Sequence, residues 1–102
     1  MNFGKMMKQV QQAQAKMAAV QEELKDETVE ASAGGGMVRV VMSGDLQVRE
    51  ISIDPAAVDP DDIELLQDMV TAAVNEALRA AQELASQKMA AVTGGINIPG
   101  LT

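Results

Sequence analysis

The chain has 102 residues, a net charge of −7 and a hydrophobic fraction of 47%. This length allows a single domain, and the absence of cysteine and histidine excludes disulfides and the usual thiol and imidazole chemistry. Alanine supplies much of the apolar fraction and contributes little burial, so we expect a homodimer. No stretch approaches the roughly 20 apolar residues of a membrane span, and no signal peptide is recognisable. We therefore expect a cytoplasmic protein with no membrane partner.

Residues 5–26 are predicted to form a helix with a regular apolar stripe. The stripe repeats at alternating spacings of three and four residues, which is the pattern of a helix that packs against another helix. Its members are Phe3, Met6, Val10, Ala13, Met17, Val20 and Leu24. Residues 1–21 also contain Lys5, Lys8 and Lys16 and no acidic residue. The start of an acidic chain is therefore basic, and phosphates would meet this end first.

Three short strands are predicted next, over residues 27–32, 37–43 and 46–53. The first two are separated by the glycine run 34–36, and the turn at Ser43-Gly44-Asp45 predicts a hairpin. In the second strand, Val38, Val40 and Met42 share one face. The apolar phase slips within the third strand, which predicts a β-bulge near Arg49-Glu50.

A second helix is predicted over residues 60–92, with Asp59 as its N-cap and Pro60 in its first turn. Its apolar stripe comprises Ile63, Leu66, Val70, Ala73, Ala77, Ala80 and Leu84. Gly94-Gly95 ends the helix and leaves a tail over 93–102, either ordered or disordered. The fold class is therefore α+β, with the order α-β-β-β-α. Two helices of this length are too long for a three-stranded antiparallel sheet, so their ends are expected to project beyond it.

No catalytic, metal or cofactor site is predicted, and we do not expect an enzyme. The serines have no recognisable activating partner. The run Gly34-Gly35-Gly36 lacks the Gly-Lys-Ser/Thr of a phosphate-binding loop and precedes a strand. The acidic residues around 59–64 lack the pattern of a calcium loop, and helix capping explains them better.

Several segments, in their order and spacing, resemble the YbaB/EbfC family of bacterial nucleoid-associated proteins. The matching segments are Gln21-Glu22-Glu23-Leu24, Gly34-Gly35-Gly36-Met37-Val38-Arg39-Val40, Gly44, Val48-Arg49-Glu50-Ile51-Ser52-Ile53-Asp54-Pro55, residues 65–77 and Ile98-Pro99-Gly100-Leu101. The resemblance implies a tweezer-like homodimer with central sheets and with the helices as prongs. It also implies DNA binding at the nucleoid, with an influence on nucleoid organisation and gene expression.

The leading hypothesis is that the prongs bind double-stranded DNA with little sequence specificity. The residues expected to contact phosphates are Lys5, Lys8, Lys16, Arg79 and Lys88. In an antiparallel helix pair, the start of the first helix would meet the end of the second, bringing Lys5 and Lys8 close to Lys88. Two alternatives remain open. The basic residues form an ordinary solvated surface, or the chain is a protein-interaction adaptor whose Met- and Ala-lined grooves hold an unknown protein partner.

Overall fold

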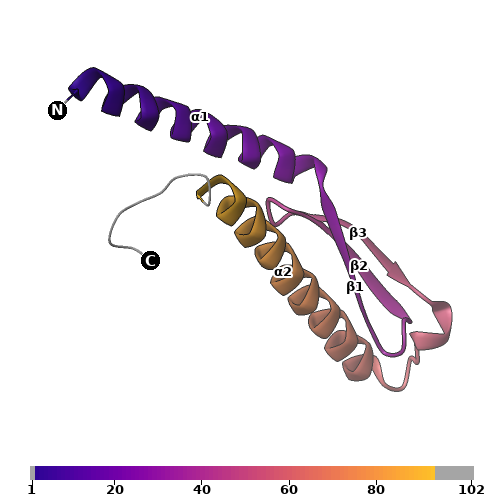
Figure 1. Cartoon of the computed structure of the whole chain (residues 1–102). Helices are drawn as coiled ribbons and strands as arrows, with labels where there is room; N and C mark the ends of the chain where they lie inside the picture. Colours follow the sequence, from indigo (N-terminus) through magenta and orange to yellow (C-terminus); the bar gives the residue numbers. More distant parts are fainter. Residues whose placement is uncertain (1, 94–102) are drawn as a thin grey trace.

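A three-stranded antiparallel sheet with two long helices organises residues 2–93, the part of the chain that the computed structural model describes. The elements are α1 (Phe3–Asp26), β1 (Thr28–Ala33), β2 (Val38–Ser43), β3 (Val48–Ile53), the short 3-10 helix η1 (Pro55–Ala57) and α2 (Ile63–Thr93). Figure 1 shows α2 lying along the sheet while α1 leaves it and carries the N-terminus far away. The predicted α+β class and α-β-β-β-α order are confirmed. The predicted tail lies, from residue 94 on, outside the described residues.

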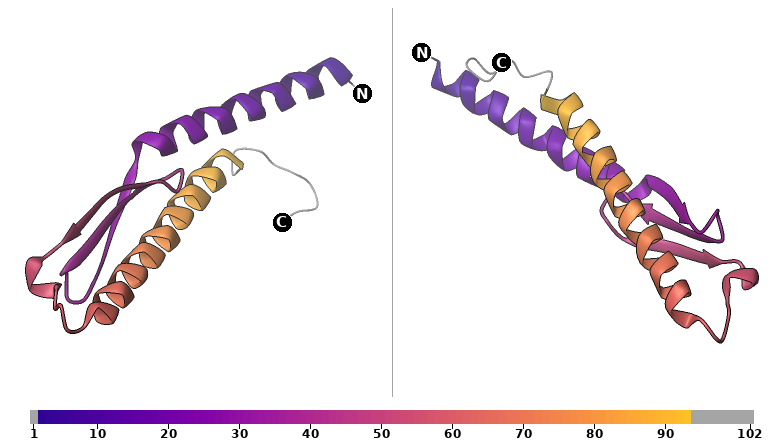
Figure 2. Two further views of the ribbon diagram at one scale, coloured as in Figure 1. Left: turned by 180° about the vertical axis from the view of Figure 1, so that it is seen from behind. Right: turned by 90° about the horizontal axis from the view of Figure 1, so that it is seen from below.

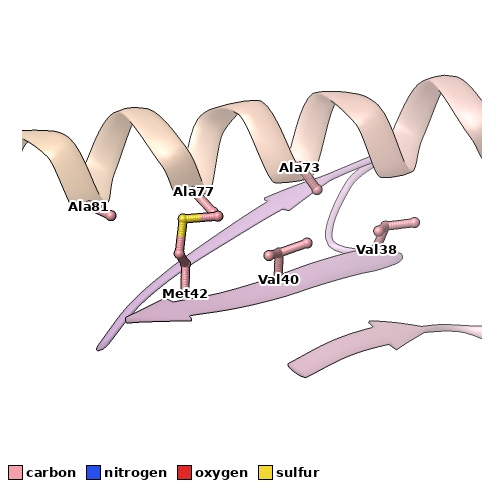
Figure 3. Close-up of a cluster of buried hydrophobic side chains, with 6 residues drawn as sticks. All are labelled: Val38, Val40, Met42, Ala73, Ala77 and Ala81. Carbon is pink, nitrogen blue, oxygen red and sulfur yellow. The ribbon is translucent and has the colours of Figure 1, made fainter. Parts of the chain in front are cut away.

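The core forms between the central strand β2 and one face of α2. Val38, Val40 and Met42 alternate along β2 and are buried, as period-two patterning predicts. Alanines spaced four residues apart on α2 pack against them, and Figure 3 shows the two rows facing each other. These alanines are Ala73, Ala77 and Ala81. Because alanine is small, the helix backbone lies close to the strands, and residues with larger side chains, such as Val70 and Leu78, pack around the row.

The predicted stripe of α2 needs two corrections. Ile63, at its start, is 45% exposed and not buried, and the stripe also misassigns one alanine. It placed Ala80 in the core, whereas Ala81 is fully buried and Ala80 is only half-buried. The sequence allows either residue because alanines occupy both positions. The buried face of α2 follows Ala73, Ala77 and Ala81, which are spaced four residues apart and pack against the sheet.

β3 contains the predicted bulge. Val41 pairs with Glu50 while the next residue, Met42, pairs with Val48, so Arg49 is the extra residue. Directly opposed residues of two antiparallel strands share a face of the sheet. The bulge therefore keeps the apolar residues of β3 on the same face as the buried residues of β2, which is the face toward α2. However, α2 lies over β1 and β2. The apolar row of β3 therefore remains uncovered, with exposures of 46% for Val48, 44% for Ile51 and 41% for Ile53.

Both helices begin at different residues from those predicted. α2 begins at Ile63, three residues later than expected, because Asp62 rather than Asp59 caps it; the Asp62 Oδ1 accepts a hydrogen bond from the Leu65 N–H at 3.2 Å. Asp59 instead accepts a bond from the Asp61 N–H at 2.9 Å in the preceding turn. Either aspartate suits a helix start by sequence. α1 begins earlier than expected, at Phe3, and Asn2 caps it.

The strands begin later than predicted. β1 and β2 each start one residue late, and β3 starts at Val48 instead of residue 46. The last difference follows from the hairpin turn, where Leu46 adopts a left-handed conformation with φ 67° and so cannot continue the strand. Its N–H donates to the Ser43 carbonyl at 2.9 Å, which closes the turn.

Gly44 is expected to tolerate no side chain. A Cβ at this position would lie 2.8 Å from the Leu24 carbonyl oxygen and 2.7 Å from the Leu24 Cδ2. Gly44→Ala should therefore push the base of α1 away from the hairpin and lower the free energy of unfolding by about 1–3 kcal/mol. Thermal unfolding at fixed protein concentration measures the loss. Gly4→Ala is the matched control, because the nearest atom to its Cβ is the Asn2 Oδ1 at 3.6 Å. Equal stability of both variants would refute the close approach.

Candidate nucleic-acid interface

α1 is held to the body of the protein only at its C-terminal end. Val20 and Leu24 are buried, whereas the stripe residues nearer the N-terminus are exposed, reaching 73% at Phe3. The two views of Figure 2 show the N-terminal part of α1 extending past the sheet. A 24-residue helix is roughly 36 Å long. Most of α1 is therefore a projecting rod.

Polar contacts fix the direction in which α1 leaves the sheet. The Arg49 guanidinium donates through Nη2 to the Lys25 carbonyl at 3.1 Å, which ties the bulge of β3 to the end of α1. The Lys88 ammonium of α2 pairs with the Glu23 Oε2 at 3.2 Å and the Glu27 Oε2 at 2.9 Å. One cation therefore joins α2 to the end of α1 and to the residue that follows it.

Lys88 is already paired with these two carboxylates. The carboxylates of Glu27 and then Glu23, which accept hydrogen bonds from the Lys88 ammonium, raise the pKa of Lys88 above its usual value, so it stays protonated at neutral pH. Lys88 meets the last third of α1 and not its start. Fifteen residues separate Glu23 from Lys8, which is about 22 Å along a helix. The expectation that Lys5 and Lys8 meet Lys88 is therefore wrong, because α1 and α2 pair only near the sheet.

Arg79 is also neutralised by its neighbours. Its guanidinium lies 2.6 Å from the Glu76 Oε1 and 3.1 Å from the Glu83 Oε2, both on the same helix. The Glu76 hydrogen bond is the main cause that raises the pKa of Arg79, and in return Arg79 lowers the pKa of the Glu76 carboxyl. Any phosphate would have to displace two carboxylates from this guanidinium.

Three lysines of α1 have no carboxylate partner within the described part of the chain. The other five basic residues each have one within 4.0 Å: Lys25, Arg39, Arg49, Arg79 and Lys88. We call Lys5, Lys8 and Lys16 the lysine face, since 3.6 residues per turn place them within an arc of about 80°. All three are exposed. The amides of Gln9 and Gln12 fall beside them on the same side of the helix.

Six of the fifteen acidic residues gather at the other end of the molecule. Segment 54–68 contains Asp54, Asp59, Asp61, Asp62, Glu64 and Asp68, and Figure 1 shows it beyond the end of the sheet that is far from the N-terminus. Several of these carboxylates accept bonds from backbone N–H groups, as Asp54 does from Ala56 at 2.9 Å. Over residues 2–93, no group of acidic residues is arranged to hold a metal ion. The molecule extends 71 Å along its principal axis, and the two charged groups lie toward opposite ends of it.

Comparison with known proteins decides the family. The model of the YbaB/EbfC DNA-binding family matches residues 1–96. This chain belongs to that family. It is 57% identical over 99 residues to a nucleoid-associated protein of Moorella thermoacetica, covering 97% of this chain and 95% of the relative. A nucleoid-associated protein of Pelotomaculum thermopropionicum is 55% identical over 100 residues, covering 98% of this chain and 95% of the relative.

The fold is also similar to a solved structure. The crystal structure of an uncharacterised Helicobacter pylori protein matches with a TM-score of 0.74 and 24% identity, covering 85% of this chain and 91% of that one. The resemblance to the YbaB/EbfC family seen in the sequence is confirmed. Among the described residues, no helix is long and apolar enough to cross a membrane.

The structure divides the five predicted DNA-contacting residues of this YbaB/EbfC member into two groups. Lys5, Lys8 and Lys16 lie together on a projecting helix, whereas Arg79 and Lys88 lie on α2 and already pair with carboxylates. The sequence reasoning missed the uncovered row on β3. Its phase slip was visible, but nothing in the sequence shows which strands α2 covers.

Lys88 is expected to hold α1 in place. Lys88→Gln removes the cation shared by Glu23 and Glu27, so the melting temperature should fall and amide hydrogen exchange should speed up in residues 17–26. Lys25→Gln is the matched control, because the one ion pair of Lys25 in the described part of the chain is with Glu22 on the same exposed helix surface. Unchanged exchange in the Lys88 variant would show that packing alone orients α1.

Proposed function

We propose that this chain is a homodimeric nucleoid-associated protein that binds double-stranded DNA with little sequence specificity through the lysine faces of its α1 prongs. It acts by binding and not by catalysis, in the cytoplasm at the nucleoid, and influences nucleoid organisation and gene expression. One observation carries the proposal: the three lysines without a carboxylate partner in the described part of the chain share one face of a projecting helix. Membership of a DNA-binding family and relatives named as nucleoid-associated support it.

The lysine face suits phosphates better than bases. Lys5 and Lys8 are separated by about 4.5 Å along the helix axis, and Lys8 and Lys16 by about 12 Å, so the three ammonium groups can follow a phosphate backbone. Lysine is a point charge on a flexible stem and reads little sequence. The chain has no tyrosine or tryptophan for base stacking. Backbone contact and DNA shape therefore dominate recognition.

The net charge of −7 does not prevent this binding, because the charges are segregated. No acidic residue precedes Glu22, and the acidic segment 54–68 lies at the opposite end of the molecule. At physiological ionic strength, charges are screened over about 8 Å. A duplex at the prong therefore interacts with the lysine face and is screened from the distant acids. Arg79 and Lys88 contribute only where DNA displaces their carboxylates.

A second copy of the chain supplies the second prong. Among the described elements, β3 is an edge strand whose outer side has no partner strand, and its apolar row is uncovered. Exposed edges and apolar rows of this kind favour association. A twofold contact through β3 places the same row on both subunits, as a symmetric dimer requires. The dimer then presents six lysines of the lysine face in two groups.

The exposed apolar stripe of α1 favours a second candidate function, a protein-interaction adaptor. Met6, Val10 and Met17 are at least 38% exposed and offer an adaptable apolar surface to an unknown protein. The two functions differ in one measurable respect, since the adaptor requires no DNA binding at physiological salt.

DNA binding should depend on salt and on the lysine face. Fluorescence anisotropy with a labelled duplex of roughly 30 base pairs should give a log–log salt slope of about −5, because a dimer neutralising three phosphates per protomer releases the matching counterions. Lys8→Gln removes two of these contacts per dimer, so it should weaken binding and reduce the slope by about 2. Lys25→Gln, on the same helix but outside the lysine face, should bind like the wild type. Binding that does not vary with salt would contradict the proposal, and absence of binding at every salt concentration would favour the adaptor.

The dimer should break when β3 receives a charge on its apolar row. Ile51→Glu places a carboxylate on a surface that is exposed in the protomer but buried in the proposed dimer, so light scattering should report a folded monomer. Ser52→Glu is the matched control, because Ser52 points to the opposite face of the same strand. A dimeric Ile51→Glu variant would place the interface elsewhere, and a monomeric wild type would overturn the dimer itself.

A further inference from the structure

The side of α1 that faces the end of α2 is apolar and largely exposed. Val20 is buried, but the larger stripe residues are exposed from Met17 to the N-terminus, and the exposure reaches 73% at Phe3. Figures 1 and 2 show α2 ending beside the middle of α1, while the N-terminal part of α1 extends past it. This part of the stripe therefore offers a helical apolar surface to another molecule.

A cleft lies where the buried part of the stripe ends. It has a volume of about 290 Å³, between α1 and the last turns of α2, and its lining residues are Lys16, Val20, Glu23, Lys88, Ala91 and Val92. A cavity of about 150 Å³ already holds benzene, so the cleft has room for an aromatic ring. The one aromatic residue of the sequence, Phe3, is exposed at the other end of the stripe.

We propose that α1 of a second copy packs antiparallel on this stripe and inserts its Phe3 into the cleft. Phe3 cannot enter the cleft of its own chain, because it lies about 26 Å from Val20 along the same helix. In an antiparallel pair of helices, Phe3 of each copy reaches Val20 of the other. The contact is twofold symmetric, so it fills both clefts at once.

The rest of the stripe fits this arrangement. The stripe alternates spacings of three and four residues, and this pattern is the same when it is read in either direction. Once the two phenyl rings are in the clefts, Met6 of each helix faces Met17 of the other, and Val10 faces Ala13. Apolar residues therefore meet apolar residues along the whole contact, and the small side chain of Ala13 lets the helices approach closely.

The charges beside the stripe also permit a second copy. In the exposed part of α1, the positions that flank the stripe carry the uncharged residues Met7, Gln9 and Gln14, and one lysine, Lys16. In this register Lys16 faces Gln9 of the other copy, so no two lysines oppose each other. The other two lysines of the lysine face point away from the contact. The positive N-terminal end of each α1 also meets the negative C-terminal end of the other copy's α2, which is favourable for the helix dipoles.

The size of the surface makes this contact weaker than an obligate one. The exposed side chains of two stripes bury about 1,000 Å² in total, which is near the lower limit for a specific interface. We therefore expect the contact to form at protein concentrations of roughly 100 µM and above. Because it does not use β3, it joins dimers into larger assemblies and does not replace the dimer contact proposed above.

Mixing a Met6→Cys variant with a Met17→Cys variant tests the register, since the chain has no native cysteine. Both positions are exposed in the protomer, at 49% and 38%, so neither change should unfold it. Under mild oxidation, a disulfide between the two variants should form at least about tenfold faster than in a mixture of Met6→Cys with Ala15→Cys, because residue 15 lies within about 3 Å of the height of residue 17 but on the opposite side of α1. Peptide mass mapping with one variant isotopically labelled identifies which chains are joined.

The same experiment separates the other arrangements. In the antiparallel register, like residues of the two copies stay about 17 Å apart along the helix. Disulfides that form fastest between two Met6→Cys chains, or between two Met17→Cys chains, would show parallel helices and overturn the proposal. Equal rates in the two mixtures would show that the stripe does not bind a second copy. DNA takes no part in this measurement, so its outcome is separate from that of the proposed function.

Sedimentation equilibrium tests the insertion of Phe3. The average mass of the wild type should rise as its concentration increases from roughly 10 µM to 1 mM. Phe3→Ser removes both rings from the clefts, so it should raise the Kd of this association at least about tenfold. Gly4→Ser is the matched control, because it adds the same side chain about 100° around the helix from Phe3; its Kd should stay within about twofold of the wild type. A wild-type mass that stays constant with concentration, or equal Kd values for the two variants, would overturn the proposal.

Discussion

The packing of an alanine row against the central strand determines the rest of this structure. Ala73 and Ala77 lie against Val40 and its neighbours on β2, and their small side chains let α2 approach the sheet closely. Such a narrow contact fixes the position of the helix, because a larger residue in the row would force the layers apart. With α2 centred over β1 and β2, the third strand remains uncovered and the end of α2 reaches the base of α1.

That placement gives the protomer two incomplete surfaces. The row on β3 is apolar by residue type and faces the correct side of the sheet, yet no element of the described chain covers it. The stripe on α1 is buried only at Val20 and Leu24. A chain with so much alanine and little aromatic surface buries little apolar area alone. In the proposed dimer, a second copy covers the row on β3, whereas the N-terminal part of the stripe on α1 remains exposed in the protomer.

Charge pairing separates structural cations from those available for a ligand. Lys88 and Arg79 each contact two carboxylates, so their charges orient helices or neutralise neighbouring acids. Within residues 2–93 the lysine face has no such partners, and residues 1–21 contain no acid. A protein with a net charge of −7 can thus present a locally cationic prong. The distance between the prong and the acidic segment makes this segregation effective at physiological ionic strength.

The sequence by itself determined the elements, their order, the bulge near Arg49 and the basic character of the first helix, because these depend on periodicity, turn residues and local composition. It also carried the family resemblance. Only the tertiary structure decided which aspartate caps α2, that Ala81 lies in the core, that β3 is uncovered, and that Lys88 meets Glu23 instead of the start of α1. Each of these depends on where two elements distant in the chain come together, and local residue patterns contain no information about that contact.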